Sequence, residues 1–352
     1  MCGRGSRAPP RRRCDLGQLN ETQRYFVEED LEEFRDGLIT RRELMRRVTL
    51  ITGSAVAAAT ILAACDLSPR GGAGGVASPT AAATAVPTAA PAASAGFVAA
   101  GPYATPPAGP TTDGVTVKPD DPRIAVSRPD VRGSDGASLM AYLATPNLSG
   151  RVPGITVVHE NRGQTEHIRD VVRRVATAGF VGLNIDLAAR DGGADKMTDQ
   201  GLYNAALGRR STADKLKDHD AAIAFLKSQT SGVVVVTGFC FGGGETWNIL
   251  IAGLDVRAGV PFYGPQPANY TDLSRTKAAV SAVYAELDTR ITATAPQMEE
   301  QLRKAGVPYQ ITVYPGVNHA FHNDTNGPDR YSAVQSQRAW VATIEWFKKY
   351  LR

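Results

Sequence analysis

Cysteine is scarce in this sequence of 352 residues. The four cysteines are Cys2, Cys14, Cys65 and Cys240, and no pair within the globular part has the spacing of metal ligands or of a redox dithiol. We therefore expect no disulfide framework, no metal and no cofactor. A thiol redox protein is also disfavoured, because thiol exchange needs a second, resolving cysteine.

Excess charge is nearly absent as well. The chain carries 39 Lys and Arg against 35 Asp and Glu, a formal net charge of +4. Residues 1–64 hold 11 of the basic and 9 of the acidic side chains, so the remainder has a net charge of +2. Binding to a polyanion needs a concentrated basic patch. We therefore expect no nucleic-acid partner.

One uncharged apolar run, Val48–Ala64, follows the basic segment Thr40–Arg46. A basic stretch, an apolar run and a small-residue end are the three parts of a bacterial signal peptide. The run has 17 residues, which is short for a membrane-spanning helix. The segment Thr40–Arg46 resembles a twin-arginine export motif. Leu62–Cys65, which reads Leu-Ala-Ala-Cys, resembles a lipobox, in which the cysteine is acylated and becomes the mature N-terminus.

These motifs predict a protein exported and lipid-anchored through Cys65 to the outer side of a bacterial membrane, periplasmic or at the cell surface. The alternative is a plain signal anchor in which Cys65 is incidental.

Composition divides the chain into three regions. Residues 1–64 form an N-terminal extension with the export signal, in which only Glu28–Gly37 suggests a short amphipathic helix. Residues 65–112 are mostly Ala, Pro, Thr, Gly and Ser, too poor in large apolar groups to bury a core, so they predict a disordered tether. Residues 113–352 are enough for one domain with a large core.

The third region alternates strands and helices after an opening antiparallel pair. This order predicts an α/β fold with a doubly wound, mostly parallel sheet of about eight strands flanked by helices. Ligands of such sheets bind beyond the carboxyl ends of the strands. The predicted strands are Ile124–Ser127, Leu139–Ala144, Gly154–His159, Val181–Asp186, Val233–Thr237, Ala258–Tyr263, Ala279–Tyr284 and Tyr309–Tyr314, and the predicted helices are His167–Thr177, Asp214–Ser228, Ala295–Ala305 and Tyr331–Tyr350.

Residues 233–244 read Val-Val-Val-Val-Thr-Gly-Phe-Cys-Phe-Gly-Gly-Gly. Strand, Gly-x-Cys-x-Gly and helix form a nucleophile elbow with cysteine in the place of serine. The residues two before and two after the nucleophile, Gly238 and Gly242, must lack side chains for the turn to close. The following helix directs its first amides, that of Phe241 included, to where an oxyanion would form. We interpret Cys240 as a nucleophile, the alternative being an ordinary buried cysteine.

A thiol nucleophile needs a base and an orienting acid, which in this fold follow it in the order acid, base. Asp288 follows the predicted strand Ala279–Tyr284, and His319 follows the last strand. His319 would accept the thiol proton, and Asp288 would fix its tautomer and stabilise the imidazolium. Either residue alone is typical of a turn or a solvated loop, but together, in order and at strand ends, they predict a triad.

Cys240 in Gly-Phe-Cys-Phe-Gly-Gly, Asp288, His319 and the segment His-Glu-Asn-Arg-Gly at residues 159–163 resemble the dienelactone hydrolase family, α/β hydrolases with a Cys-Asp-His triad. The resemblance covers about residues 115–352. It implies that Glu160 contacts the cysteine and helps to form the thiolate when substrate arrives, and that the amide of Asn161 completes the oxyanion hole with that of Phe241.

The resemblance also bears on substrate binding, because the family holds a substrate carboxylate with two arginines. Arg190 matches the first, and a guanidinium suits a carboxylate clamp. The place of the second falls on Asn323, which puts affinity for a small anionic lactone in doubt. Tyr263 matches a pocket tyrosine of the family, the alternative being an ordinary core residue.

We therefore expect a dienelactone hydrolase-like enzyme, of the carboxymethylenebutenolidase type, that hydrolyses lactones or small carboxylic esters through an acyl-thioester. We also expect it to be a monomer with a small-molecule substrate. The alternative function is a surface lipoprotein that uses the hydrolase fold as a ligand-binding module without turnover, since a fold does not fix a function.

Overall fold

The computed structural model describes residues 16–65, 67, 97–99 and 115–351. Its chain divides into two compact units. Among the described residues, 16–65 and 204–211 belong to the first unit, and 97–99, 115–203 and 212–351 to the second.

Three helices make up most of the first unit: α1 (Glu21–Arg35), α2 (Arg41–Thr52) and α3 (Ala55–Ala64). Helix α1 begins at a capping box, in which Asn20 and the residue three positions later exchange side-chain and backbone hydrogen bonds. The predicted helix Glu28–Gly37 covers only the second half of α1. No single described helix meets the length and hydropathy criteria for a membrane span, although α2 and α3, bent by 120°, meet them together.

The segment predicted to be an export signal therefore forms helices. Arg47 of α2 pairs with Asp30 and Glu33 of α1, at 3.1 and 2.8 Å, and with Glu43 of its own helix at 2.7 Å. Cys65 at the end of α3 is disulfide-bonded. No disulfide framework was expected, and this single bond was not predicted.

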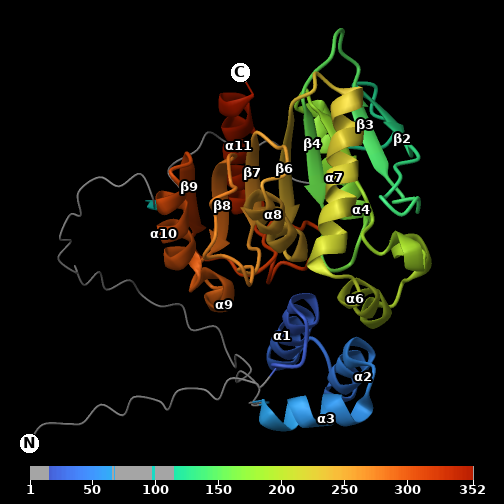
Figure 1. Ribbon diagram of the computed structural model, residues 1–352, viewed down its shortest axis with the longest axis vertical. Helices are drawn as coiled ribbons and strands as arrows, with labels where there is room; N and C mark the ends of the chain where they lie inside the picture. The colour runs from blue at the N-terminus through green and yellow to red at the C-terminus, as the bar shows by residue number, and fades with distance from the viewer. Residues whose placement is uncertain (1–15, 66, 68–96, 100–114, 352) are drawn as a thin grey trace, which may run out of the picture. The chain divides into compact units, whose positions relative to one another are not determined.

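The second unit is built on one sheet, which has nine strands in the described part of the chain. Its spatial order is β1-β9-β8-β7-β6-β4-β5-β3-β2 (Figure 1). All pairs are parallel except β2 with β3 and β3 with β5. The strands are β1 (Phe97–Ala99), β2 (Ile124–Ser127), β3 (Tyr142–Pro146), β4 (Gly154–Val158), β5 (Val181–Asn184), β6 (Val234–Phe239), β7 (Ala258–Phe262), β8 (Ala279–Ala285) and β9 (Tyr309–Tyr314).

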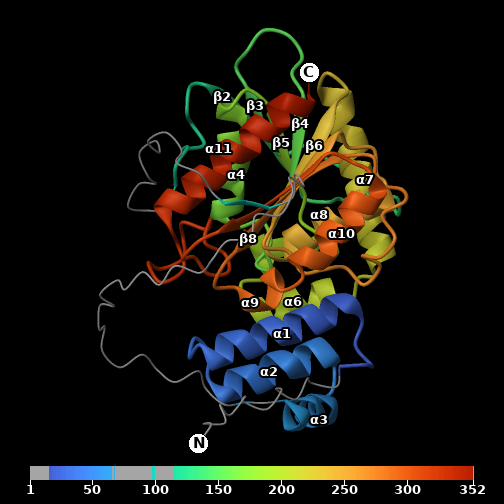
Figure 2. The same ribbon diagram turned by 90° about the vertical axis from the view of Figure 1, so that its left-hand side faces the viewer.

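Helices cover both faces of this sheet. Figure 2 shows α4 and α11 on one face and α7, α8 and α10 on the other. Every residue of β4, β6, β7 and β8 is buried, as a strand covered on both faces requires. The elements between the strands are α4 (Glu166–Thr177), η1 (Ala189–Asp191), α5 (Gly193–Lys196), α6 (Gln200–Gly208), α7 (Thr212–Gln229), α8 (Phe241–Ala252), α9 (Thr289–Thr292), α10 (Ala295–Ala305) and the closing α11 (Ala333–Tyr350).

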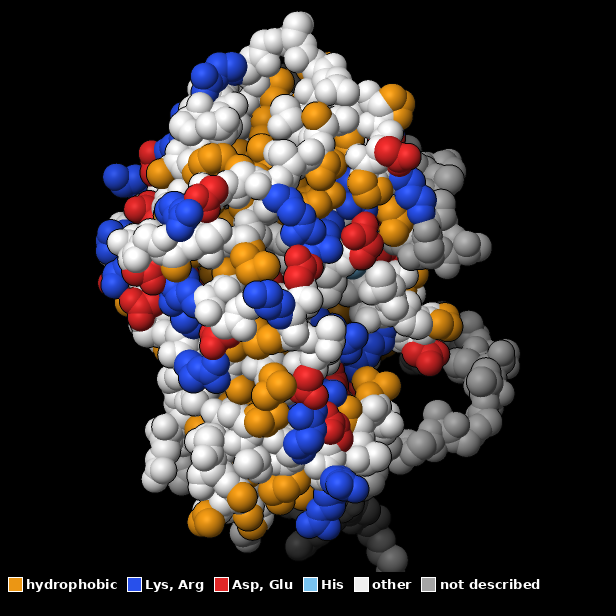
Figure 3. Space-filling view, turned by 90° about the vertical axis from the view of Figure 1, so that its right-hand side faces the viewer, with side chains coloured by type: hydrophobic (Ala, Val, Ile, Leu, Met, Phe, Trp, Pro, Cys, Tyr) orange, Lys and Arg blue, Asp and Glu red, His pale blue; other side chains and the backbone are white. Residues whose placement is uncertain are grey.

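The predicted α/β-hydrolase architecture is confirmed, including the antiparallel opening pair. One strand was not predicted. β1 lies inside the segment 65–112 predicted as a disordered tether and pairs in parallel with β9, so that prediction is wrong for residues 97–99. The rest of the predicted tether, apart from Cys65 and residue 67, lies outside the described residues. Basic and acidic side chains are interspersed on the face shown in Figure 3, in keeping with their near-equal numbers.

Candidate active site

Cys240 occupies a sharp turn between β6 and α8. Its backbone has φ 57° and ψ −120°, a strained conformation for a residue with a side chain. The turn is held by hydrogen bonds from the Cys240 amide to the carbonyl of Phe262 (3.1 Å) and from the Gly243 amide to the carbonyl of Cys240 (2.9 Å). This is the geometry that the Gly-x-Cys-x-Gly motif predicts.

The two framing glycines are sterically required. A Cβ on Gly238 would lie 2.2 Å from the carbonyl oxygen of Gly242, and one on Gly242 would lie 2.4 Å from the carbonyl oxygen of Val158. Both contacts are with backbone, which has no side-chain freedom to relieve them. The turn therefore closes only because both positions are glycine.

Asp288 and His319 meet at the same edge of the sheet. His319 Nδ1 lies 2.6 Å from Asp288 Oδ2, and a ring nitrogen of His319 lies within 4.8 Å of Cys240 Sγ. Burial disfavours the Asp288 carboxylate, but the charge of His319 and its hydrogen bond more than offset this and hold the pKa of Asp288 below its usual range. An ionised Asp288 bonded to Nδ1 directs Nε2 of His319 as the proton acceptor.

Glu160 and Asn161 follow β4, the strand next to the elbow strand. Both residues are buried, and Glu160 Oε2 accepts a 2.5 Å hydrogen bond from the Asn323 amide. The loop is tightened by the His159 ring, whose Nδ1 lies 2.7 Å from the Glu160 carbonyl oxygen and whose Nε2 accepts from the Leu187 amide. Burial, its largest cause, lowers the pKa of His159, so the ring is neutral and carries its proton on Nδ1.

Tyr263 is buried next to His319. Its ring packs edge-on against His319, with centroids 5.2 Å apart. Burial, together with the nearby charges of Glu160 and Cys240, raises its pKa well above the usual range, so the phenol keeps its proton. The structure thus brings Tyr263 to the candidate site.

Arg190, in η1 after β5, is engaged elsewhere. Its guanidinium donates two hydrogen bonds to Asp135 and two to Asp218, at 2.7–2.9 Å. A substrate carboxylate would have to displace one of these partners. Asn323 is also engaged, with Glu160. The two residues at the family's clamp positions, Arg190 and Asn323, are therefore both engaged within the protein in this structure.

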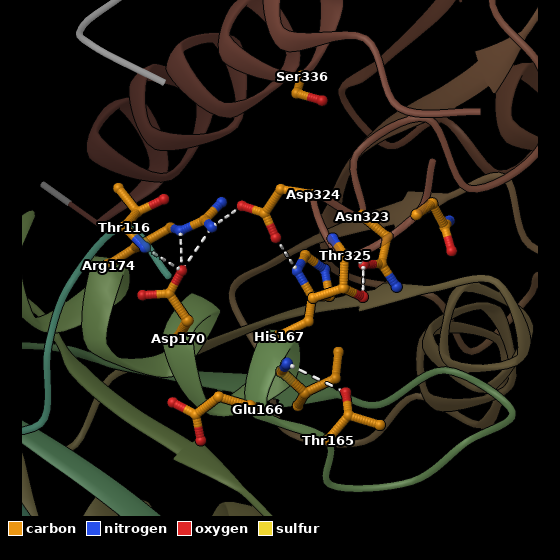
Figure 4. Close-up of polar contacts among 12 residues, drawn as sticks. Thr116, Thr165, Glu166, His167, Asp170, Arg174, Asn323, Asp324, Thr325 and Ser336 are labelled. Carbon is orange, nitrogen blue, oxygen red and sulfur yellow. Dashed lines mark hydrogen bonds and ion pairs between the residues drawn. The ribbon is translucent and has the colours of Figure 1, made fainter. Parts of the chain in front are cut away.

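Several polar residues next to the site were not predicted. Asp324 lies 2.7 Å from His167 Nδ1 and also pairs with Arg174, both on α4. Asp170 accepts a hydrogen bond from Arg174 Nε at 2.9 Å. The sequence did contain one indication of these contacts (Figure 4), because Asp170 and Arg174 lie four residues apart on one face of the predicted helix.

The model of the dienelactone hydrolase family matches residues 139–351. The chain belongs to the dienelactone hydrolase family. A proposed carboxymethylenebutenolidase of Methylorubrum extorquens is 33% identical over 255 residues, covering 68% of this chain and 87% of the relative. One of Escherichia coli K12 is 32% identical over 265 residues, covering 70% and 94%.

A solved structure agrees with the family assignment. The crystal structure of a proposed dienelactone hydrolase from Klebsiella pneumoniae is similar with a TM-score of 0.59 and 28% identity, covering 64% of this chain and 99% of that one. Family membership confirms the predicted fold and the predicted enzyme class, a lactone or carboxylic ester hydrolase.

Proposed function

We propose that the protein hydrolyses lactones or small carboxylic esters with Cys240 as nucleophile. The observation that carries the proposal is the positive-φ cysteine on its glycine elbow, with the His319 ring within 4.8 Å and Asp288 fixing that ring. Most nucleophile elbows carry a serine. A cysteine in this position indicates that the attacking group is a thiolate.

The reaction divides into two steps. The thiol proton passes to His319 or Glu160, and the thiolate attacks the ester carbonyl. The amides of Phe241 and Asn161 stabilise the oxyanion, which collapses to an acyl-thioester as the alcohol departs with the proton that the thiol gave up. Water, deprotonated by His319, then cleaves the thioester and releases the acid.

The charge of the preferred substrate depends on whether Arg190 and Asn323 can bind a carboxylate. Arg190 is neutralised by two carboxylates, and Asn323 carries no charge. Neutral esters should therefore compete well with anionic lactones. A strong preference of the wild type for a dienelactone over neutral aryl esters of similar size would contradict this.

Substitution of the nucleophile and the base tests the proposal. Cys240→Ala and His319→Ala should each lower turnover by about a thousand-fold or more, since members of a nucleophile and base unit fail together. Cys240→Ser keeps the geometry but should be slow, because a hydroxyl is much harder to deprotonate than a thiol. Ester hydrolysis and circular dichroism are measured on the same samples. A folded Cys240→Ala protein with wild-type turnover would place the chemistry elsewhere, and binding of esters without turnover by the wild type would favour the ligand-binding alternative.

We further propose export of the protein as a monomer anchored through a lipid on Cys65. The support is the Leu-Ala-Ala-Cys sequence after a basic and apolar segment. A thioether-linked lipid and the disulfide at Cys65 exclude each other, so mass spectrometry of the native N-terminus separates them. Light scattering of the purified protein tests the monomer.

A further inference from the structure

The first turn of α8 consists mostly of glycine. It reads Phe241-Gly242-Gly243-Gly244, and Glu245 is the next residue with a side chain. Cys240, at the N-cap position, makes no side-chain capping hydrogen bond. Glycine is unfavourable in a helix, because its backbone loses more conformational freedom on folding than that of any other residue. The turn that carries the Phe241 amide is therefore weakly determined by its own sequence.

The packing around this turn excludes side chains that could stiffen it. A Cβ on Gly243 would lie 2.3 Å from the carbonyl oxygen of Phe262, and one on Gly244 would lie 2.7 Å from Cγ of Pro265. The side chains that hold the turn are therefore those at its two ends, Phe241 and Glu245.

Lys215 of α7 contacts both ends of the glycine run. Its Nζ lies 4.9 Å from the centroid of the Phe241 ring and 2.6 Å from Oε1 of Glu245. The side chains of Lys215 and Glu245 are only 1% and 3% exposed, so water competes little for this ion pair. An ammonium group over an aromatic face is attracted by the ring, and more strongly where water is excluded. One buried cation thus joins the residue before the three glycines to the residue after them.

Glu245 is a charged partner in this arrangement. Burial alone would raise the pKa of its carboxyl group, but the Lys215 ammonium and His219 outweigh this and hold the pKa at about 2. His219 lies one turn after Lys215 on α7, with Nε2 3.5 Å from Glu245 Oε2. The carboxylate is therefore ionised and held against α7 by two of its side chains.

Phe241 links these charges to the candidate oxyanion site. Its amide is one of the two proposed oxyanion donors, and its ring lies beside that of His159, with centroids 6.0 Å apart. His159 begins the loop after β4, in which Asn161 offers the second donor. An oxyanion donor is effective only within hydrogen-bond distance of the developing charge, so a small displacement of the turn lowers its contribution.

We propose that Lys215 is a positioning residue, which bridges the Phe241 ring and the Glu245 carboxylate and so holds the Phe241 amide where the oxyanion forms. This inference rests on the proposed function. The Lys215 bridge, meaning Lys215 with the Phe241 ring and the Glu245 carboxylate, acts on the addition of the thiolate to the carbonyl rather than on formation of the thiolate.

Two rates measured on Cys240 of the full chain test the inference. Acylation by a neutral aryl ester in a single turnover passes through an oxyanion. Alkylation by iodoacetamide, followed by peptide mass spectrometry, displaces iodide from a saturated carbon and forms no oxyanion.

The double variant Lys215→Met and Glu245→Gln removes both charges of the pair together, because loss of one would leave the other buried and unpaired. It should slow acylation about ten- to a hundred-fold and change alkylation at the same pH by less than about twofold, since only acylation uses the oxyanion hole. Equal slowing of both rates would mean a general disturbance of the elbow, and unchanged acylation would mean that the bridge is not needed. Either result overturns the inference.

A second ion pair of α7 provides the matched control. Lys227 pairs with Asp255 near solvent, where the two side chains are 24% and 89% exposed. The double variant Lys227→Met and Asp255→Asn should acylate and alkylate like the wild type, because this pair does not contact the first turn of α8. Slow acylation in this control as well would assign the effect to α7 as a whole and contradict the inference.

Phe241→Leu tests the other end of the bridge and does not depend on folding of the charge variants. It removes the ring, keeps the amide, and should slow acylation selectively. Combined with Lys215→Met and Glu245→Gln, it should slow acylation less than the product of the two separate effects, because both remove the same bridge. Fully multiplicative effects would mean that Lys215 does not act through Phe241.

Failure of the inference and failure of the proposed function give different results. Wild-type acylation rates in the bridge variants, in a protein that is acylated on Cys240, would reject the inference alone. Absence of acylation on Cys240 in the wild type would reject the proposed function, and this is seen without any variant.

Discussion

The turn that carries Cys240 and the loop that carries His319 are held in shape by different means. Backbone sterics form the first, since Gly238 and Gly242 lie within two residues of the cysteine and admit no Cβ. Polar contacts across the chain form the second. Asn323 and Asp324 bond to partners 150–163 residues away. The turn at Cys240 therefore tolerates no added atom at its glycines. The loop that carries His319 can lose its polar contacts one at a time.

Adding one methyl group to the elbow should have the largest effect. Gly238→Ala and Gly242→Ala each place a Cβ within 2.4 Å of a backbone oxygen, so the turn must open. We expect at least a thousand-fold loss of ester hydrolysis and destabilisation of about 3 kcal/mol or more. Gly327→Ala, where no atom lies within 4 Å of the new Cβ, is the matched control. Wild-type activity in either elbow variant would show that the glycines are not required.

Removing one charge from the His319 loop should cost less activity but measurable stability. Asp324→Asn leaves His167 without its carboxylate and Arg174 with Asp170 alone, and breaking a buried pair costs about 3–5 kcal/mol. Asp195→Asn is the control, because this exposed aspartate pairs with Arg128 and Arg169 near solvent and should change stability by less than about 1 kcal/mol. Urea unfolding compares the two. Equal losses would mean that the loop is not anchored by Asp324.

His322, in the loop that carries His319, makes the free energy of unfolding depend on pH. The steric constraint at Gly238 and Gly242 involves no titratable group. Burial, assisted by the charges of Arg174 and His167 and opposed by that of Asp324, lowers the pKa of His322 well below 6.5. The unfolded chain then takes up a proton that the folded protein excludes. The free energy of unfolding should therefore fall as the pH drops below 6.5, by up to about 1.4 kcal/mol per unit.

His322→Gln should make this decline shallower between pH 7 and pH 5, though not flat, because the pKa of His159 is also lowered by burial. Urea unfolding at both pH values measures the difference. An unchanged decline in the variant would mean that His322 does not exclude the proton.

The same contrast explains what the sequence could predict. Four valines followed by Gly-x-Cys-x-Gly specify a buried strand and a strained turn within twelve residues, and the structure has both. Each strand and helix also has its own local sequence pattern, and their order along the chain predicted the sheet. β1 was missed because three residues in a low-complexity segment show no strand periodicity.

The partners of the charged side chains could not be predicted in this way. An arginine at a strand end, such as Arg190, could serve either in a substrate clamp or in a structural ion pair. Only the fold shows that Asp135 and Asp218 pair with it. Asn323 likewise matched a substrate-binding position, while its bond to Glu160 depends on the meeting of two distant loops. Helix α1 was predicted only in its second half, and α2 and α3 were missed because export signals and amphipathic helices share basic and apolar stretches.

Trapping of the acyl-enzyme tests the central claim most directly. The wild type is mixed with a neutral aryl ester, quenched in acid within the first turnovers and analysed by intact-mass and peptide mass spectrometry. The account predicts one acyl group per chain, on the peptide that contains Cys240, released by hydroxylamine as a thioester is and absent from Cys240→Ala. An acyl group on another residue, or steady hydrolysis by a folded Cys240→Ala protein, would contradict it.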